Sequence, residues 1–102
     1  MYVRCTFFKA VPGKEEDVKR LYQEKVIPVL KKQQGLVDAR LLEPADKADD
    51  FISMTEWISK PEADAYDNSG LYQQLVHKLD GLWAKAPVLK IYEVEQVAVP
   101  NL

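Results

Sequence analysis

The stretch from residue 51 to residue 82 constrains the fold most, because it changes from a strand pattern to a helix pattern at one point. Its first nine residues, FISMTEWIS, predict a β-strand. One face of that strand would carry Phe51, Ser53, Thr55 and Trp57. Ser59 and Glu62 then stand at the spacing of a capping box around Pro61, which predicts that a helix begins at this point.

A break at Asn68-Ser69-Gly70 separates this short helix from a second one that begins at Leu71 and continues to Trp83. At about 100° per residue the second helix has one broad apolar face. That face carries Leu71, Tyr72, Leu75, Val76, Leu79, Leu82 and Trp83. His77 falls nearly opposite the centre of the apolar face, among polar residues.

The remaining elements can be placed around this stretch. Residues 2–11 predict a strand, 14–34 a helix with a kink at Pro28 and a C-cap at Gly35, and 36–43 a second strand. Residues 45–50 predict a hairpin loop, and 88–97 a last strand before a tail at 98–102. The expected core stripe of the first helix is Val18, Leu21, Tyr22, Val29 and the stem of Lys25. The order β-α-β-β-α-β predicts one α+β domain over residues 2–97, with a ferredoxin-like antiparallel sheet.

The first strand is apolar on both faces, which indicates that both faces of the sheet are covered. Val3, Cys5, Phe7 and Val11 share one face, and Tyr2, Phe8 and Ala10 the other, where Arg4 and Thr6 interrupt the pattern. Two helices cover only one face of a sheet, so the other face needs a partner. We expect a homodimer that forms through the open sheet face.

Composition excludes several classes of protein. A net charge of −2 over 102 residues argues against a nucleic-acid partner, and the third predicted strand lacks the basic and glycine residues of an RNA-recognition motif. Cys5 is the single cysteine, so neither an internal disulfide nor a cysteine-based metal site is expected. No apolar run reaches the roughly 20 residues of a membrane helix, and no export signal opens the chain. We expect a cytoplasmic protein with no membrane partner.

Several segments together resemble a known family. They are VPGKEEDV, PVLKKQQGLVDARLLEP, the strand end E-W-x-S, the turn A-x-A-Y, and a Ser before an amphipathic helix. In order and spacing they resemble the antibiotic biosynthesis monooxygenase family over roughly residues 2–96. The resemblance implies a ferredoxin-like subunit that pairs into a dimeric α+β barrel. Members of that family include cofactor-free oxygenases, haem degraders and proteins of no known activity.

The resemblance also suggests site residues. Trp57 stands where the quinone-forming oxygenases keep an active-site tryptophan, Ser53 where they have an asparagine, and His77 where they have a catalytic arginine. Tyr66 stands where the haem degraders carry a tryptophan. Their asparagine and axial histidine fall on Thr6 and Leu75, which disfavours haem, so no cofactor and no metal are expected.

Each candidate has a second interpretation that the sequence leaves open. Trp57 either lines a cavity or fills the core, Tyr66 is either a ligand-binding phenol or an interface aromatic, and His77 is either a base or a surface residue. Tyr72 belongs either to an aromatic wall or to the core. Arg4 and Arg40 either form interface salt bridges with Glu43, Glu56 or Glu93, or anchor an anionic substrate.

The resulting prediction is a cofactor-independent monooxygenase that oxidises a small aromatic phenol or hydroquinone with O₂. Trp57, Tyr66 and His77 are the predicted catalytic residues, and Ser53, Thr6 and Tyr72 the predicted substrate-binding residues. No strong base is evident in the sequence. Two alternatives therefore stay open: a non-enzymatic dimeric module that binds a small metabolite, and an isomerase acting on one.

Overall fold

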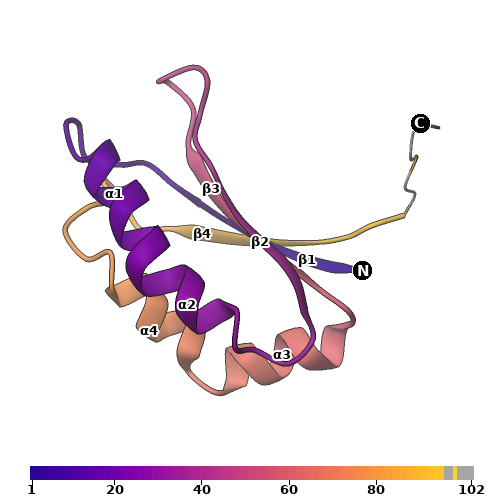
Figure 1. Ribbon diagram of the computed structural model, residues 1–102. Helices are drawn as coiled ribbons and strands as arrows, with labels where there is room; N and C mark the ends of the chain where they lie inside the picture. Colours follow the sequence, from indigo (N-terminus) through magenta and orange to yellow (C-terminus); the bar gives the residue numbers. More distant parts are fainter. Residues whose placement is uncertain (96–97, 99–102) are drawn as a thin grey trace, which may run out of the picture.

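The computed structural model describes residues 1–95 and 98 and contains a single four-stranded sheet (Figure 1). Val97, predicted at the end of the last strand, and the predicted tail apart from Ala98 lie outside the described residues. In chain order the elements are β1 (Tyr2–Phe8), α1 (Glu15–Leu21), the π-helical turn η1 (Tyr22–Val26), α2 (Ile27–Leu30), β2 (Leu36–Leu42), β3 (Phe51–Trp57), α3 (Lys60–Asn68), α4 (Leu71–His77) and β4 (Val88–Glu93).

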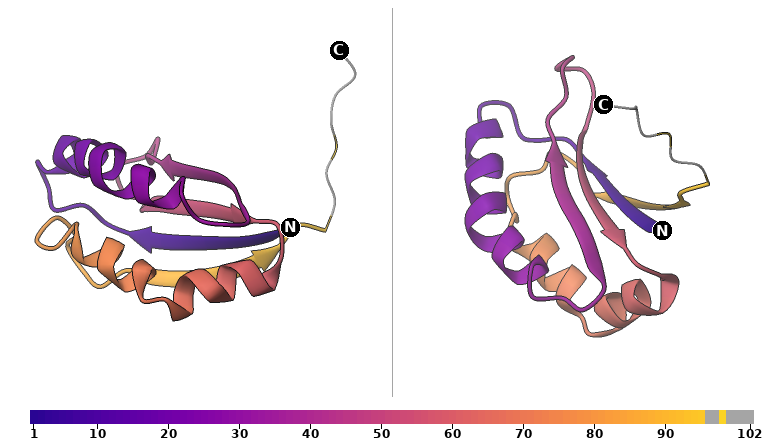
Figure 2. Two further views of the ribbon diagram at one scale, coloured as in Figure 1. Left: turned by 60° about the horizontal axis from the view of Figure 1, so that its bottom comes forward. Right: turned by 45° about the vertical axis from the view of Figure 1, so that its right-hand side comes forward.

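The strands lie in the order β2-β3-β1-β4, and each neighbouring pair is antiparallel. This is the split β-α-β arrangement, in which β1 and β3 occupy the centre of the sheet. The helices lie together on one side of the sheet and leave its other side uncovered (Figures 1 and 2). The predicted α+β ferredoxin-like fold is therefore confirmed.

The first helical segment differs from the prediction of one kinked α-helix. It stays helical from Glu15 to Leu30, but a π-turn at 22–26 comes just before Pro28. Proline has no N–H to donate and its ring crowds the carbonyl one turn earlier, and a widened turn relieves both problems. The side chains that this segment buries are Val18, Tyr22, Val26 and Leu30. The predicted stripe was wrong at Lys25, which is exposed. The predicted C-cap at Gly35 was also wrong, because the helix ends at Leu30 with Lys31 as its C-cap and turns follow it.

The second helical region ends earlier than predicted. The helix α4 stops at His77, and residues 78–82 continue as turns closed by short i→i+3 hydrogen bonds, such as Leu82 N–H to the Leu79 carbonyl. Trp83 then forms an isolated β-bridge with Ala10, beyond the end of β1. Trp83 thus belongs to the sheet edge rather than to the helix.

The junction between α3 and α4 fixes the aromatic residues on both helices. Ser69 Oγ donates a hydrogen bond to the Tyr66 carbonyl at 2.6 Å and accepts one from the Leu71 N–H at 3.3 Å. Gly70 has φ +84°, a left-handed value that glycine adopts without strain. The predicted break at 68–70 is confirmed, and it sets the positions of the two helices that follow one another across it.

The start of α3 is held differently from a capping box. Ser59 occupies the N-cap position as predicted, but its hydroxyl bonds the Glu62 carboxylate instead of a backbone N–H. The aliphatic part of Glu62 lies against Gly35, which has φ +85°. A Cβ atom at Gly35 would lie 2.3 Å from Glu62 Cγ and 2.5 Å from its Cβ, so a side chain has no space there.

Helical membrane spans are not found in the part of the chain that the structure describes, since no helix there is long and apolar enough to cross a bilayer.

Gly35→Ala tests whether this close contact matters for stability. Gly13 also has φ +85° but has open space around it, so Gly13→Ala is the matched control for backbone strain alone. We expect Gly13→Ala to lower the free energy of unfolding by about 1–2 kcal/mol. Gly35→Ala should cost about 1–3 kcal/mol more, because Glu62 must also move. Urea denaturation measures both values, and equal losses would show that the contact with Glu62 imposes no constraint.

Candidate functional site

The helix-facing side of the two central strands is polar where a core is normally apolar. Arg4 of β1 lies directly opposite Thr55 of β3, and Thr6 lies opposite Ser53. Apolar pairs flank these positions: Phe8 opposite Phe51 at one end and Tyr2 opposite Trp57 at the other. Arg4, Thr6 and Thr55 are buried although they carry polar groups. Buried polar residues are the informative exceptions in a folded core. We call Arg4, Thr6, Ser53 and Thr55 the polar floor, and they mark the candidate site.

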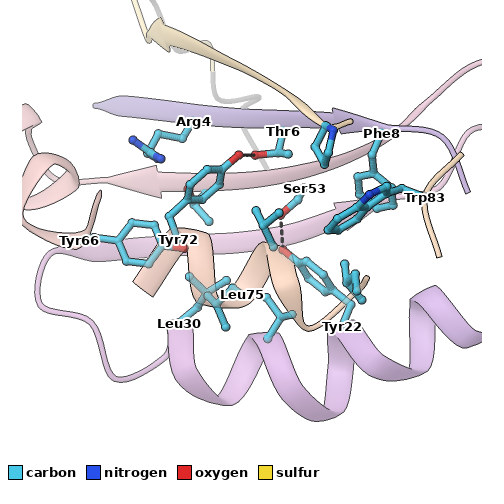
Figure 3. A pocket seen from close by; sticks show the side chains of 15 residues that line it. Arg4, Thr6, Phe8, Tyr22, Leu30, Ser53, Tyr66, Tyr72, Leu75 and Trp83 are labelled. Carbon is cyan, nitrogen blue, oxygen red and sulfur yellow. Dashed lines mark hydrogen bonds between the residues drawn. The ribbon is translucent and has the colours of Figure 1, made fainter. Parts of the chain in front are cut away.

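Hydroxyl groups from the helices satisfy the middle of the polar floor. Tyr72 of α4 shares a hydrogen bond of 3.0 Å with Thr6 Oγ1. Tyr22 of η1 shares one of 2.8 Å with Ser53 Oγ. Figure 3 shows both tyrosines reaching from the helical layer to the strands. In each pair one hydroxyl donates and the other accepts, so one proton per pair remains available for a ligand.

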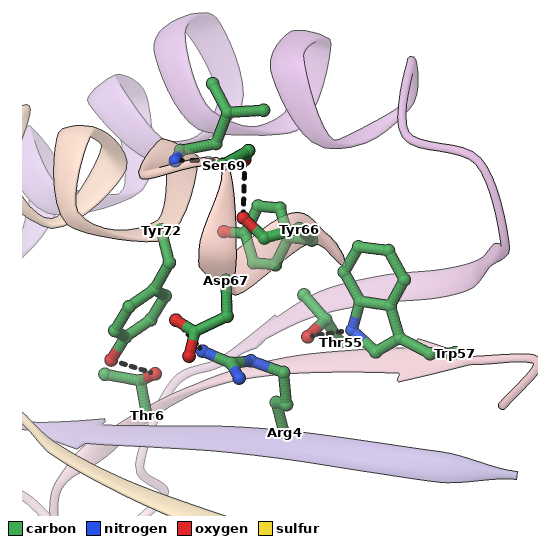
Figure 4. Close-up of polar contacts among 9 residues, drawn as sticks. Arg4, Thr6, Thr55, Trp57, Tyr66, Asp67, Ser69 and Tyr72 are labelled. Atoms are coloured by element: carbon green, nitrogen blue, oxygen red, sulfur yellow. Dashed lines mark hydrogen bonds and ion pairs between the residues drawn. The ribbon is translucent and has the colours of Figure 1, made fainter. Parts of the chain in front are cut away.

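The ends of the polar floor are satisfied differently. The indole N–H of Trp57 donates to Thr55 Oγ1 at 2.9 Å, within the core. Arg4 Nη2 donates to Asp67 Oδ1 at 3.2 Å, and Asp67 lies on α3 (Figure 4). Each of the four floor residues therefore has a side-chain partner, and three of the four partners come from the helical layer.

A cavity lies between the polar floor and the helices. Its apolar walls come from β1, η1, α2, the α4 region and the residues before β4: Phe8, Val26, Leu30, Leu75, Val76, Leu79, Trp83 and Pro87. The centre of a water-sized molecule can move through about 50 Å³ of this cavity. One water needs about 10–15 Å³ by this measure. The cavity therefore has room for a few waters, and a ring-sized ligand requires its side chains to move.

Tyr66 of α3 forms the aromatic end of the cavity. Its ring stacks on Trp57 with centroids 4.9 Å apart and meets the Tyr72 ring edge-on at 6.4 Å. The Arg4 guanidinium lies 5.6 Å from the centroid of Tyr66 and 4.8 Å from that of Tyr72. Cation–π attraction of this kind holds the guanidinium between the two rings.

Burial keeps the buried phenols protonated. Desolvation raises the pKa of Tyr66, and the nearby Arg4 charge only partly opposes it. Desolvation also raises the pKa of Tyr22, against the hydrogen bond with Ser53. Both phenols are neutral at physiological pH and can donate hydrogen bonds into the cavity.

The structure brings together four of the six predicted site residues. Thr6, Ser53, Tyr66 and Tyr72 all line the cavity. Trp57 is 0% exposed and lies behind Tyr66, so the core interpretation fits it. Its contribution is to hold Tyr66 and Thr55 in place.

His77 lies outside the cavity. Its side chain is 69% exposed, and its Nδ1 lies 3.2 Å from Asp80 Oδ2 at the surface. Of the two interpretations of this residue, the surface one fits the structure. We therefore assign His77 no part in the chemistry of the cavity.

Two cavity residues were missed or misassigned from the sequence. Tyr22 was placed in the core stripe alone, because the π-turn that aims it at Ser53 leaves no pattern in the sequence. Of the two interpretations of Arg4, the salt bridge was predicted with Glu43, Glu56 or Glu93, but within the subunit Arg4 pairs with Asp67. The other interpretation, an anchor for an anionic substrate, stays a prediction. The available signal was that Arg4 and Thr6 interrupt the face of β1 that carries Phe8. Arg40 pairs with Asp38 at 2.6 Å and is exposed on β2, away from the cavity.

Haem does not fit this cavity. The lining residues that the structure describes include no histidine, cysteine or methionine, and Leu75 occupies the place suggested for an axial histidine. Within residues 1–95 and 98, no group of three or more His, Cys, Asp or Glu side chains could hold a metal ion.

Comparisons with solved structures show the same fold at low sequence identity. The heme-degrader MhuD from Mycobacterium tuberculosis superposes with a TM-score of 0.80 at 16% identity, covering 97% of this chain and 100% of that one. A variant of SnoaB, a cofactor-independent oxygenase from Streptomyces nogalater, gives a TM-score of 0.77 at 12% identity, covering 94% of each chain. A conserved protein from Methanosarcina mazei gives 0.73 at 17% identity, covering 90% of this chain and 91% of that one.

A comparison with curated protein sequences found no match. A family profile does match: residues 1–78 fit that of the antibiotic biosynthesis monooxygenases. The matched region contains β1 to α4 and most of the cavity described above. The chain therefore belongs to the antibiotic biosynthesis monooxygenase family.

Proposed function

We propose that this protein is a cofactor-independent monooxygenase that binds a small aromatic phenol or hydroquinone in the cavity and oxidises it with O₂. One observation carries the proposal: a mainly apolar cavity receives two phenol–hydroxyl pairs, Tyr72–Thr6 and Tyr22–Ser53, from opposite layers of the fold. Family membership and the likeness to a cofactor-independent oxygenase support it.

The two pairs suit an oxygenation that passes through an anion. An anthrone-type phenol has a CH₂ group that O₂ converts to a carbonyl, with the second oxygen atom leaving as water. This balance needs no outside reductant. Once the substrate loses its first proton, negative charge resides on its oxygen, and pre-aimed hydroxyl donors stabilise it. The apolar walls exclude water from the reactive intermediate.

The weak point of the cavity for this chemistry is proton removal. Arg4 is the one charged residue among the described lining residues, and a guanidinium is not a base. The substrate must therefore be acidic enough to ionise with help from the hydroxyl donors alone. This observation favours a second candidate function: a dimeric module that binds a small metabolite without converting it.

Oxygen uptake with anthrone and hydroquinone substrates separates the two functions. We expect metal-free protein to consume O₂ with anthrone in the presence of a chelator. Tyr72→Phe or Tyr22→Phe should reduce the rate at least about tenfold, because removal of one oxyanion donor commonly costs 10²–10³. Lys25→Ala, at an exposed position of η1 outside the cavity, is the control. His77→Ala should keep the wild-type rate.

If no substrate raises uptake above the uncatalysed rate, the oxygenase proposal fails. Quenching of the fluorescence of Trp83, which lines the cavity, by anthrone under those conditions would then support the binding module.

The donor role of the phenols also predicts how stability depends on pH. Burial raises the pKa of Tyr22 and Tyr66 in the folded state, so the folded protein holds their protons more tightly than the unfolded chain. Their contribution is complete below the unfolded value of about 10 and is lost progressively as the pH rises above it. We expect the free energy of unfolding in urea to fall between about pH 10 and 11 and to fall less steeply in Tyr66→Phe. An unchanged slope in that variant would contradict the assignment.

We further propose that the protein works as a homodimer through the open face of the sheet. The strand registers place eight apolar residues on that face: Val3, Cys5, Phe7, Leu42, Ile52, Met54, Val88 and Tyr92. Leu42, Val88 and Tyr92 are exposed in the single chain. The same registers place the charged residues Arg40, Glu56 and Lys90 among them, so the face is mixed rather than uniformly apolar. Exposed apolar side chains gathered on one face of an isolated subunit indicate an interaction surface.

Sedimentation velocity tests the dimer. Ile52→Lys puts a charge among the apolar residues of the open face, between Phe7 of β1 and Leu42 of β2, and we expect it to shift the protein from dimer to monomer. Gln23→Lys adds the same charge on the exposed side of η1 and should leave the dimer intact. A wild-type monomer at micromolar concentration would contradict the proposal.

A further inference from the structure

Arg4 is a buried cation whose hydrogen-bonding capacity is largely unused. The residue is 3% exposed, yet its one side-chain hydrogen bond within the described residues runs from Nη2 to Asp67. Its Nε is fully buried and has no partner among residues 1–95 and 98. A guanidinium has five N–H donors, and a buried donor of a charged group left unpaired is costly. An unpaired buried donor at the wall of a cavity therefore suggests that Arg4 has a role in ligand binding.

Asp67 compensates the charge of Arg4 only in part. The contact is single and 3.2 Å long, and the Asp67 side chain is 44% exposed while Arg4 is 3% exposed. Water screens the more exposed partner, which weakens the pair. The rings of Tyr66 and Tyr72 hold the guanidinium in place without neutralising it, because both residues meet it with their aromatic faces. The cavity therefore carries excess positive charge at this end.

The unused donor and the Asp67 contact lie on one edge of the guanidinium plane. Nε and Nη2 form the edge that binds a carboxylate side-on, through two parallel hydrogen bonds. Asp67 accepts from Nη2, whereas Nε is covered by the protein and has no hydrogen-bond partner within residues 1–95 and 98 (Figure 4). A planar anion that entered the cavity could accept from both. Asp67 then occupies part of the place that a ligand would fill.

We infer that Arg4 is the anion-binding residue of the cavity and that its ligand carries a carboxylate on an apolar body. The carboxylate of the ligand accepts hydrogen bonds side-on from Nε and Nη2 and replaces Asp67 as the acceptor of Nη2. The apolar body of the ligand extends over the polar floor toward Tyr22 and Ser53. This inference rests on the proposed function only in using the same cavity, and it narrows the ligand to an organic monoanion.

Binding of benzoate and isobutyrate, each compared with its neutral amide, tests the inference directly. Each acid and amide pair has nearly the same shape, so the ratio of dissociation constants reports the charge alone. We expect at least about a tenfold preference for the acid, as for a charge-assisted bidentate contact. In ¹H–¹⁵N spectra the Arg4 Nε–H signal should shift with benzoate and stay in place with benzamide, an effect that a purely structural arginine would not show.

Two variants should move the preference in opposite directions. Arg4→Gln is expected to bring the acid-to-amide ratio close to one. Asp67→Asn removes the competing carboxylate and should tighten benzoate binding several-fold. Arg20→Gln, which removes a cation from the surface of α1, is the matched control and should leave the ratio unchanged.

The outcomes decide the inference even if Arg4→Gln does not fold. Asp67→Asn that binds benzoate more weakly would show that the Arg4–Asp67 pair is structural and would overturn the inference. No acid preference in the wild-type protein, or no binding of either acid, would overturn it as well. Benzoate is not a substrate for oxygenation, so a clear acid preference without any O₂ uptake would reject the oxygenase proposal and leave the anion site standing.

Discussion

The hydrogen bonds between strand hydroxyls and helix phenols are the interactions on which the rest of the site depends. Thr6 and Ser53 lie on the two central strands beneath the helical layer, and a buried hydroxyl without a partner costs about 1–3 kcal/mol. Tyr72 and Tyr22 supply the partners from the helical layer at 3.0 and 2.8 Å. The helices are thus fixed at the height of a tyrosine side chain above the sheet. The cavity lies beside these two hydrogen-bonded pairs.

The position of Tyr22 depends on the π-turn. In a regular α-helix, side chains four residues apart drift by about 40° around the axis at each step. Val18, Tyr22, Val26 and Leu30 are nevertheless all buried, because the wider turn at 22–26 takes up part of that drift. Pro28 gives a local reason for the widened turn, since it disfavours a regular α-helix there. Through the π-turn, Pro28 thereby helps to place the phenol of Tyr22 in the candidate site. Such π-turns frequently occur at functional sites.

Sequence patterns predicted the fold well because each element is encoded locally. Alternation marked the strands, the 68–70 break marked the end of α3, and the order of elements then left few topologies. The site was harder, because its contacts join distant residues: Arg4 to Asp67, Thr6 to Tyr72 and Tyr22 to Ser53. Nothing near Arg4 in the sequence indicates which acid it meets. The exposed position of His77 was readable from the helical period, whereas the burial of Trp57 behind Tyr66 required the packing of α3 on the sheet.

The two faces of the sheet have complementary compositions, and this links the cavity to the proposed dimer. The helix-facing side has polar residues at the centre of β1 and β3, so it gains less apolar burial than a fully apolar core would, at about 25 cal/mol per Å². The apolar residues at the same heights, Cys5 and Met54, lie on the open face instead. Pairing of two open faces would bury these residues. In the proposed dimer, the added apolar burial of the open face would offset the smaller apolar burial at the polar floor around the cavity.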